Sequence, residues 1–215
     1  MTNRPQNVDT CDCEPTLTDQ QVIDFCRNGY LVLEGVVPDE INRKVVDYLN
    51  ENEDAASTRC SPIMAHEWFM TGVIKNPAAA GAVRSLLGED FALPVNMVNH
   101  RGKLPCRRDE WHRDGGSIYT HKLEYVQVFY YPQDCPIELG PTQVLPGSHF
   151  MRTKANMMAN FGTIIGAVPL TAPAGTIFIT VYSIWHIRLA ATAAATRDTQ
   201  FRHLLKYNYW RTTVP

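Results

Sequence analysis

Apolar residues in the first part of the chain recur at intervals of three or four, the spacing of helices that bury one face. Thr18 and Gln21 form a capping-box sequence that begins the first helix, and Gly29 ends it. The expected helices cover residues 18–28, 38–50 and 77–87. A strand is expected at residues 30–37, whereas residues 51–72 have no regular pattern.

From residue 91 onward the pattern changes to short segments rich in β-branched and aromatic residues, separated by Gly and Pro turns. The expected strands are Phe91–Asn99, Tyr125–Tyr131, Thr142–Leu145, Thr163–Leu170, Thr176–Tyr182 and His203–Trp210. Helices followed by many short strands predict a mostly β fold with flanking helices. We expect a double-stranded β-helix (a cupin-like jelly roll) with the N-terminal helices packed on one sheet.

Length and composition indicate one globular domain. The chain has 215 residues, of which 45% are hydrophobic and 20% charged. We expect residues 1–15 to be a disordered tail and residues 16–215 to form a single jelly-roll domain. A formal net charge of −2 gives no reason to expect nucleic-acid binding. Neither a transmembrane run nor a signal-peptide pattern is present, so we expect a cytoplasmic monomer or homodimer with no membrane partner.

The strongest local signal is the sequence Trp111-His112-Arg113-Asp114. Residues two apart on a strand point to the same side, so His112 and Asp114 can bind one metal ion. His186, which follows an apolar strand, is the candidate third ligand. Two histidines and one carboxylate form the facial triad of non-haem Fe(II) oxygenases and leave three coordination positions open. The H-x-D pair alone is weak evidence, because a single histidine on a strand is usually structural.

Three other segments bear on the chemistry. Residues 140–149 (GPTQVLPGSH) read as a hairpin corner in which His149 is a structural hydrogen-bonding residue. An arginine that begins a strand inside a barrel can bind a carboxylate through two hydrogen bonds, and Arg197 and Arg202 are the candidates. The basic stretch at residues 100–108 either attracts an anionic substrate or is a solvated loop.

Taken together, these segments resemble the phytanoyl-CoA dioxygenase family of Fe(II)- and 2-oxoglutarate-dependent oxygenases over about residues 16–213. The matching segments are residues 17–21, 25, 29–36, 111–114, 140–141, 145–149, 185–186 and 202–207. The resemblance implies Fe(II) bound by His112, Asp114 and His186, with 2-oxoglutarate and O2 as co-substrates.

The resemblance also assigns the 2-oxoglutarate site. It implies that Arg202 binds the far carboxylate, because an apolar strand follows it directly, although Arg197 fits the usual spacing from the distal histidine better. Asn99 and Gln127 stand where some members place polar contacts to the co-substrate. Arg188 departs from the small polar residue that some members have two positions after the distal histidine.

The implied reaction is hydroxylation of an aliphatic C–H bond in a small-molecule substrate, with release of succinate and CO2. Asp114 favours hydroxylation over halogenation, since related halogenases have a small residue at this position. Two alternatives stay open from the sequence. One is a cupin-like isomerase or hydrolase that uses a non-redox metal, and the other is a catalytically silent jelly roll that binds a ligand.

Overall fold

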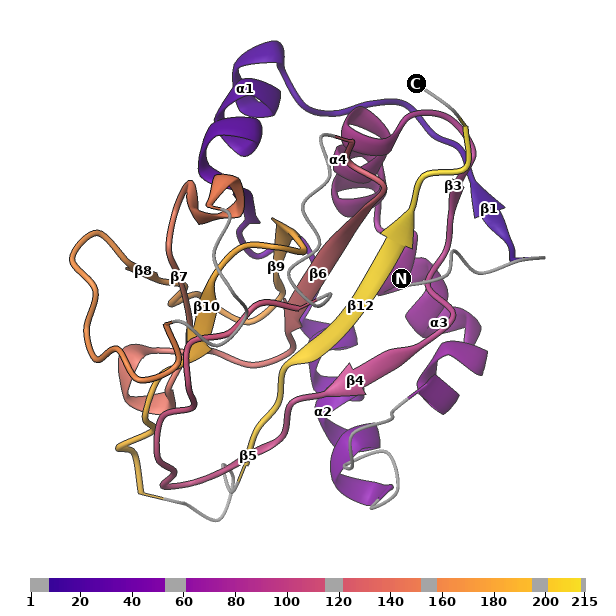
Figure 1. Cartoon of the computed structure of the whole chain (residues 1–215). Coiled ribbons are helices and arrows are strands. Elements are labelled where there is room, and N and C mark those ends of the chain that lie inside the picture. Colours follow the sequence, from indigo (N-terminus) through magenta and orange to yellow (C-terminus); the bar gives the residue numbers. More distant parts are fainter. Residues whose placement is uncertain (1–7, 53–60, 115–121, 152–157, 195–200, 214–215) are drawn as a thin grey trace.

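The computed structural model describes residues 8–52, 61–114, 122–151, 158–194 and 201–213, which form three antiparallel sheets and a group of helices (Figure 1). The strands of the largest sheet are β1 (Thr10–Cys11), β2 (Tyr30–Leu33), β3 (Phe91–Ala92), β4 (Met97–Asn99), β6 (Tyr125–Tyr131), β9 (Thr176–Val181) and β12 (Leu205–Trp210). Their order is β1-β3-β12-β6-β9-β2, and β4 pairs with β12.

Two smaller sheets complete the β structure. Their strands are β7 (Thr142–Val144), β8 (Val168–Pro169) and β10 (His186–Arg188) in one, and β5 (Gly102–Lys103) and β11 (Phe201–Arg202) in the other. The first has the order β10-β7-β8, and the second is the pair β11-β5.

The α-helices are α1 (Asp19–Asn28), α2 (Asp39–Glu51), α3 (Glu67–Phe69) and α4 (Pro77–Leu87). Short 3-10 helices lie at η2 (Ser61–Ala65), η5 (Ile137–Leu139) and η6 (Ser148–Phe150), and a π-helical turn forms η3 (Met70–Ile74). The capping box of Thr18 and Gln21 is present, and Gly29 ends α1 with a φ of 82°. Only glycine adopts that backbone conformation readily, which is why the helix stops there.

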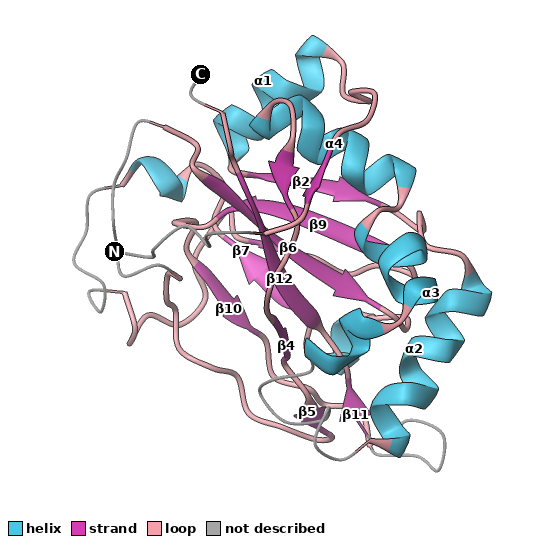
Figure 2. Cartoon of the chain, turned by 90° about the vertical axis from the view of Figure 1, so that its right-hand side faces the viewer, coloured by secondary structure: helices cyan, strands magenta, loops and turns pink. Residues whose placement is uncertain are grey.

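Strand β6 separates two hydrophobic layers, and all seven of its residues are buried. Because side chains alternate along a strand, Val126, Val128 and Tyr130 pack with the helices, whereas Phe129 and Tyr131 pack on the opposite side. That opposite side is shared with residues of the sheet that contains β7 and β8. Figures 1 and 2 show α2, α3 and α4 on one side of the large sheet and β7 and β10 on the other. The space between the two sheets is where the candidate site lies.

Several expected elements are shorter than the sequence pattern suggested. The expected strand at residues 91–99 is divided into β3 and β4 by a segment that contains Pro94, which has no N–H for the ladder. The expected strand at residues 163–170 is paired only at Val168–Pro169. The last expected strand begins at Leu205 rather than His203, and residues 61–74, expected in part to be irregular, form helical turns.

The N-terminal segment is more ordered than expected. Thr10 pairs with Ala92 in the large sheet, and the amide of Thr16 donates to the carbonyl of Gly81 at 3.2 Å. The expectation of a disordered tail is therefore wrong for residues 8–15, because unpaired strand edges recruit short extended segments. Residues 1–7 lie outside the described part. Within the described ranges, no helix has the length and apolar character needed to cross a membrane.

Candidate metal centre

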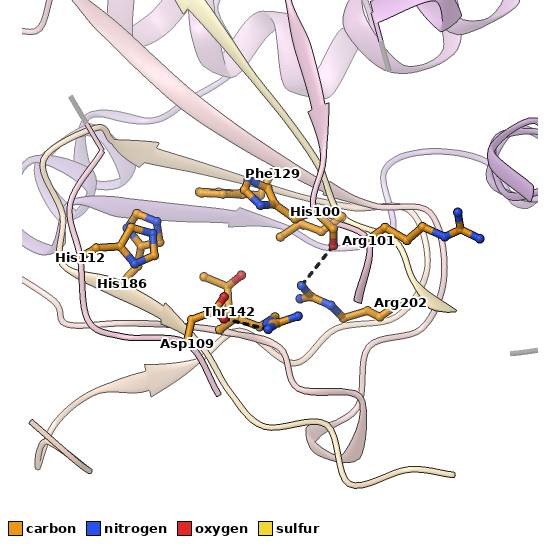
Figure 3. A pocket seen from close by; sticks show the side chains of 10 residues that line it. His100, Arg101, Asp109, His112, Phe129, Thr142, His186 and Arg202 are labelled. Carbon is orange, nitrogen blue, oxygen red and sulfur yellow. Dashed lines mark hydrogen bonds and ion pairs between the residues drawn. The ribbon is translucent and has the colours of Figure 1, made fainter. Parts of the chain in front are cut away.

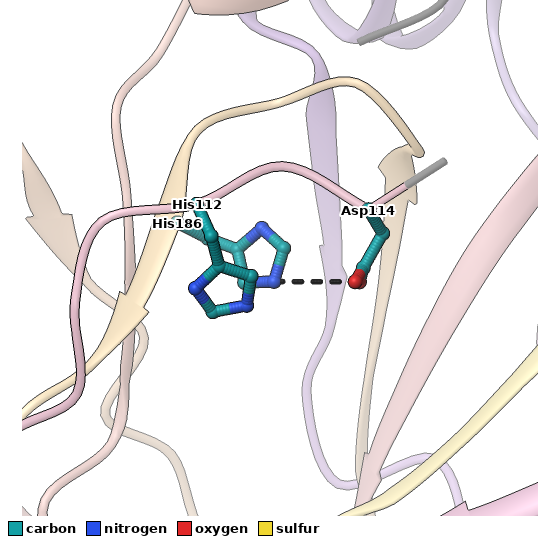
Figure 4. Close-up of side chains that lie close together, drawn as sticks. All are labelled: His112, Asp114 and His186. Carbon is teal, nitrogen blue, oxygen red and sulfur yellow. Dashed lines mark ion pairs between the residues drawn. The ribbon is translucent and has the colours of Figure 1, made fainter. Parts of the chain in front are cut away.

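His112 and His186 lie directly opposite each other on two antiparallel segments. The amide of each residue donates to the carbonyl of the other at 3.0 Å, and the two ring centroids are 4.3 Å apart. Directly opposed residues project to the same side of a sheet, so both imidazoles face the same space. Asp114 joins them, with its Oδ2 3.4 Å from Nε2 of His186 (Figure 4).

These three side chains form the one group in the described ranges that has metal-binding composition and geometry. One ligand atom from each residue lies within 4.8 Å of the other two. The two histidines are 74 positions apart in the sequence. The structure thus brings together the three residues that the sequence motif nominated as ligands.

Backbone carbonyls orient both imidazoles. Nδ1 of His112 lies 2.8 Å from the carbonyl oxygen of Glu110, and Nδ1 of His186 lies 3.1 Å from that of Ile184. A carbonyl oxygen can only accept, so Nδ1 carries the hydrogen in each hydrogen bond. In a neutral ring this leaves the lone pair on Nε2, the atom available to a metal ion.

The protonation states of the site suit metal binding. Burial lowers the pKa of His186 to about 4, so this imidazole is neutral at pH 7. Burial alone would raise the pKa of Asp114, but His186 and Lys206 hold it at about 2. Nζ of Lys206 donates to Oδ2 of Asp114 at 3.1 Å. An ionised carboxylate and a neutral imidazole are the forms that bind a metal.

A cavity of about 140 Å³ extends from the two histidines into the protein. It is lined by His100, Arg101, Asp109, His112, Phe129, Thr142, His186, Arg188, Arg202 and Leu204. Figure 3 shows His112 and His186 at one end and Arg202 at the other.

Arg202 is the most buried charge in this lining, with 2% of its surface exposed. Its Nη2 donates to the carbonyl of His100 at the long distance of 3.5 Å, and within the described ranges its Nη1 has no hydrogen-bond partner. A buried guanidinium without an anion is costly, so the site favours a ligand that brings negative charge. Arg202 belongs to β11 and lies three positions before Leu205, the first residue of β12, rather than opening the last strand as expected.

Gln127 and Asn99, the two expected polar contacts, lie on opposite faces of the large sheet. Gln127 lies two positions from Phe129 and shares its side, and its Nε2 is buried without a hydrogen-bond partner among the described residues. Asn99 pairs in register with Leu205, a residue of the helix-facing core. Its amide nitrogen lies 3.0 Å from Nδ1 of His203, and the structure does not place it in the cavity lining.

His100 occupies the place expected of Asn99. One step along a strand reverses the side to which a side chain points, so His100 lines the cavity and its neighbour does not. Burial lowers the pKa of His100 to about 4. The alternation of residues 97–100 contained this signal, but the register needed to read it comes from the pairing of β4 with β12.

The remaining expected residues have simpler outcomes. His149 is a hydrogen-bonding residue, as predicted, because its Nε2 lies 2.9 Å from the carbonyl oxygen of Cys26. Arg197, the rival for the co-substrate carboxylate, lies outside the described residues. Arg107 and Arg108, in the basic stretch, are exposed and absent from the cavity lining.

Comparison with known families identifies the chain. The model of the family described as phytanoyl-CoA dioxygenase (PhyH) matches residues 25–204. The chain belongs to this family. A search of curated proteins gave no significant match.

Solved structures share the fold of this PhyH protein at low sequence identity. HygX from Streptomyces hygroscopicus with nickel and 2-oxoglutarate bound has a TM-score of 0.71 and 14% identity, covering 92% of this chain and 88% of that chain. The epimerase SnoN in complex with Fe3+, alpha ketoglutarate and nogalamycin RO has a TM-score of 0.70 and 14% identity, covering 91% and 84%. The carbocyclase SnoK from nogalamycin biosynthesis has a TM-score of 0.68 and 15% identity, covering 93% and 88%.

Proposed function

We propose that this PhyH-family protein is an Fe(II)- and 2-oxoglutarate-dependent oxygenase that hydroxylates an aliphatic C–H bond of a small-molecule substrate. The observation that carries the proposal is one cavity that joins His112 and His186 to a buried Arg202, which has no carboxylate partner among the described residues. We also infer that the two facing sheets are the halves of a jelly roll.

The donor set fits ferrous iron. His112, Asp114 and His186 would hold the metal through two imidazole nitrogens and one carboxylate oxygen, the facial arrangement that leaves three positions open. Iron(II) with 2-oxoglutarate and O2 would supply the oxidant for the C–H bond, and succinate and CO2 would be released. Three ligands with open positions argue against a closed structural zinc site, which takes four.

The protein's own residues would position the reactants. Arg202 would hold the far carboxylate of 2-oxoglutarate through charge-assisted hydrogen bonds. Phe129 and Leu204 line the cavity with apolar surface, which excludes water from the reacting groups. Gln127 would orient Asp114 or the co-substrate from the sheet face. Asn99 was expected to do the same, but its amide nitrogen lies within hydrogen-bonding distance of His203.

A second outcome of the same oxidation is epimerisation or ring closure. SnoN and SnoK, which share the fold, are described as an epimerase and a carbocyclase. Both outcomes would use the same metal and co-substrate site, and they differ in whether an oxygen atom from O2 appears in the product. Product analysis under labelled O2 separates them once a substrate is known.

The proposal is tested with the whole protein in two steps. Fe(II) and 2-oxoglutarate are added without oxygen, and the metal-to-ligand charge-transfer absorption is recorded; O2 is then admitted and succinate is measured. We expect the absorption band and oxygen-dependent succinate. Absence of both would overturn the proposal, and turnover of a substrate with Zn(II) or Mn(II) in the absence of 2-oxoglutarate would favour the non-redox alternative.

A further inference from the structure

A second arginine reaches the same part of the cavity as Arg202. Arg188 follows His186 by two positions on β10, so its side chain leaves the strand on the side that faces the cavity. Arg202 comes from β11, which pairs with β5, and its register partner is Gly102. A Cβ placed on Gly102 would lie 3.2 Å from Nη1 of Arg188 and 3.7 Å from Nε of Arg202. The two guanidinium-bearing side chains therefore meet over the same glycine.

Each arginine has one buried hydrogen-bond donor without a partner among the described residues. These donors are Nε of Arg188 and Nη1 of Arg202. Arg188 is held from its other side, where Nη2 lies 2.8 Å from Oδ1 of Asp109 and 3.3 Å from the carbonyl oxygen of Arg107. Arg202 has no carboxylate partner in the described ranges.

The charges of the cavity lining do not balance. Of the described residues, three arginines line it against a single carboxylate, that of Asp109, which already pairs with Arg188. The Arg202 guanidinium is buried and has no carboxylate partner among the described residues, so an anion at this end of the cavity would be stabilised by Arg202 and by the neighbouring Arg188. A carboxylate has two oxygens and about four lone-pair sites, enough to accept from two guanidinium groups.

We propose that Arg188 and Arg202 bind the far carboxylate of 2-oxoglutarate together, as a two-arginine clamp. The inference rests on the proposed function and adds a second positioning residue to it. Asp109 holds Arg188 within reach, and Gly102 leaves the room that both side chains need. Arg188 acts on the co-substrate alone and takes no part in binding the metal.

The test compares two ligands that differ only at the far end. 2-Oxoglutarate and 2-oxopentanoate have the same carbon chain and the same keto-acid end, but only the first has a far carboxylate. Their affinities for the Fe(II)-loaded protein are measured by anaerobic calorimetry and by the charge-transfer band. The variants are Arg188→Gln, which can still donate to Asp109, Arg188→Lys, and Arg43→Gln, an exposed arginine on α2, as the matched control.

We expect Arg188→Gln to bind 2-oxoglutarate roughly ten- to a hundred-fold more weakly, the usual effect of losing a charge-assisted hydrogen bond. Its affinity for 2-oxopentanoate and for Fe(II) should not change, Arg188→Lys should lie in between, and Arg43→Gln should match the wild type. Unchanged 2-oxoglutarate affinity, or an equal loss for both ligands, would overturn the clamp.

The two proposals fail in different ways. A wild-type protein that binds Fe(II) but not 2-oxoglutarate contradicts the proposed function itself. A wild-type protein that binds both, together with an Arg188→Gln variant that behaves like it, rejects only the clamp. If Arg188→Gln does not fold, the Arg188→Lys variant, which keeps the charge, is used instead. A loss of affinity for 2-oxoglutarate alone supports the clamp. No loss of affinity, or an equal loss for both ligands, rejects it.

Discussion

Lys206 donates a hydrogen bond of 3.1 Å to the same Asp114 oxygen that lies 3.4 Å from His186. The Lys206 ammonium group therefore lies next to the position where a metal ion would bind. Two positive charges that share one carboxylate oxygen repel each other appreciably even when partly screened. The lysine keeps Asp114 ionised, but it also opposes the metal.

Replacing Lys206 by Met tests which effect is larger. We expect the Lys206→Met variant to bind Fe(II) or Ni(II) about tenfold more tightly, because the repulsion is removed and Asp114 remains ionised at neutral pH. Anaerobic calorimetry gives the affinity, with Lys75→Met, at an exposed position, as control. Weaker metal binding would instead show that Lys206 mainly holds the carboxylate in position.

The Asp114→Ala variant should lose most of its metal affinity and all succinate production, because one of three facial ligands is gone. The control is Glu34→Ala, which removes an exposed carboxylate outside the cavity lining. Metal affinity is measured by calorimetry and succinate by chromatography. Succinate formation at the wild-type level in Asp114→Ala would contradict the ligand assignment.

The Arg202→Met variant should separate metal binding from co-substrate binding. We expect Fe(II) affinity to be kept and 2-oxoglutarate affinity to fall roughly a hundred-fold, since a guanidinium that pairs with the carboxylate is lost. The charge-transfer band, titrated with 2-oxoglutarate, reports the change. Arg108→Met, at an exposed position outside the cavity lining, serves as control, and a normal titration of Arg202→Met would remove Arg202 from the site.

The stability of the metal-free protein should fall as the pH is lowered from 6.5 towards 4. Burial lowers the pKa values of His100, His186 and His203 from 6.5 to about 4. In this interval the unfolded chain binds protons that the folded protein does not. The contribution of these histidines to the free energy of unfolding is therefore greatest above pH 6.5 and decreases below it. Each histidine accounts for roughly 3 kcal/mol at most.

Urea unfolding at several pH values measures this slope. The His203→Gln variant removes one of the three titrating groups, so its free energy of unfolding should depend less steeply on pH than that of the wild type. An exposed histidine, His66, replaced by Gln, should leave the slope unchanged. Identical slopes for His203→Gln and the wild type would show that His203 does not change its protonation on unfolding.

Gly140 should tolerate no side chain. Its φ is 67°, and a Cβ there would lie 2.5 Å from the carbonyl oxygen of Leu189 and 2.9 Å from the amide of Ala191. Backbone strain of this kind costs about 1–3 kcal/mol, and the clash adds to it. Gly140→Ala should therefore lower the thermal unfolding midpoint, whereas Gly162→Ala, where a Cβ meets nothing within 4 Å, should not. Equal midpoints would contradict this reading of the Gly140-Pro141 turn.

Local patterns in the sequence predicted the local structure well. The capping box at Thr18, the limits of α4 and the limits of β6 all follow from interactions between residues near each other in the chain. The strand expected at residues 91–99 is divided at the segment with Pro94, because the expectation ignored the N–H that proline lacks, and the strand expected at residues 163–170 is paired only at Val168–Pro169. The short strand at Thr10–Cys11 was missed because its pairing partner is far away in sequence.

The sequence by itself determined the ligand types and the alternation that puts His112 and Asp114 on one side of the chain. It did not determine the register between strands, and register decides which side of a sheet enters the cavity. For this reason Asn99 was nominated where His100 lies, and the meeting of Arg188 with Arg202 over Gly102 was not foreseen. Hydrogen bonds between distant segments, such as those between His112 and His186, bring these side chains together, and only the tertiary structure contains them.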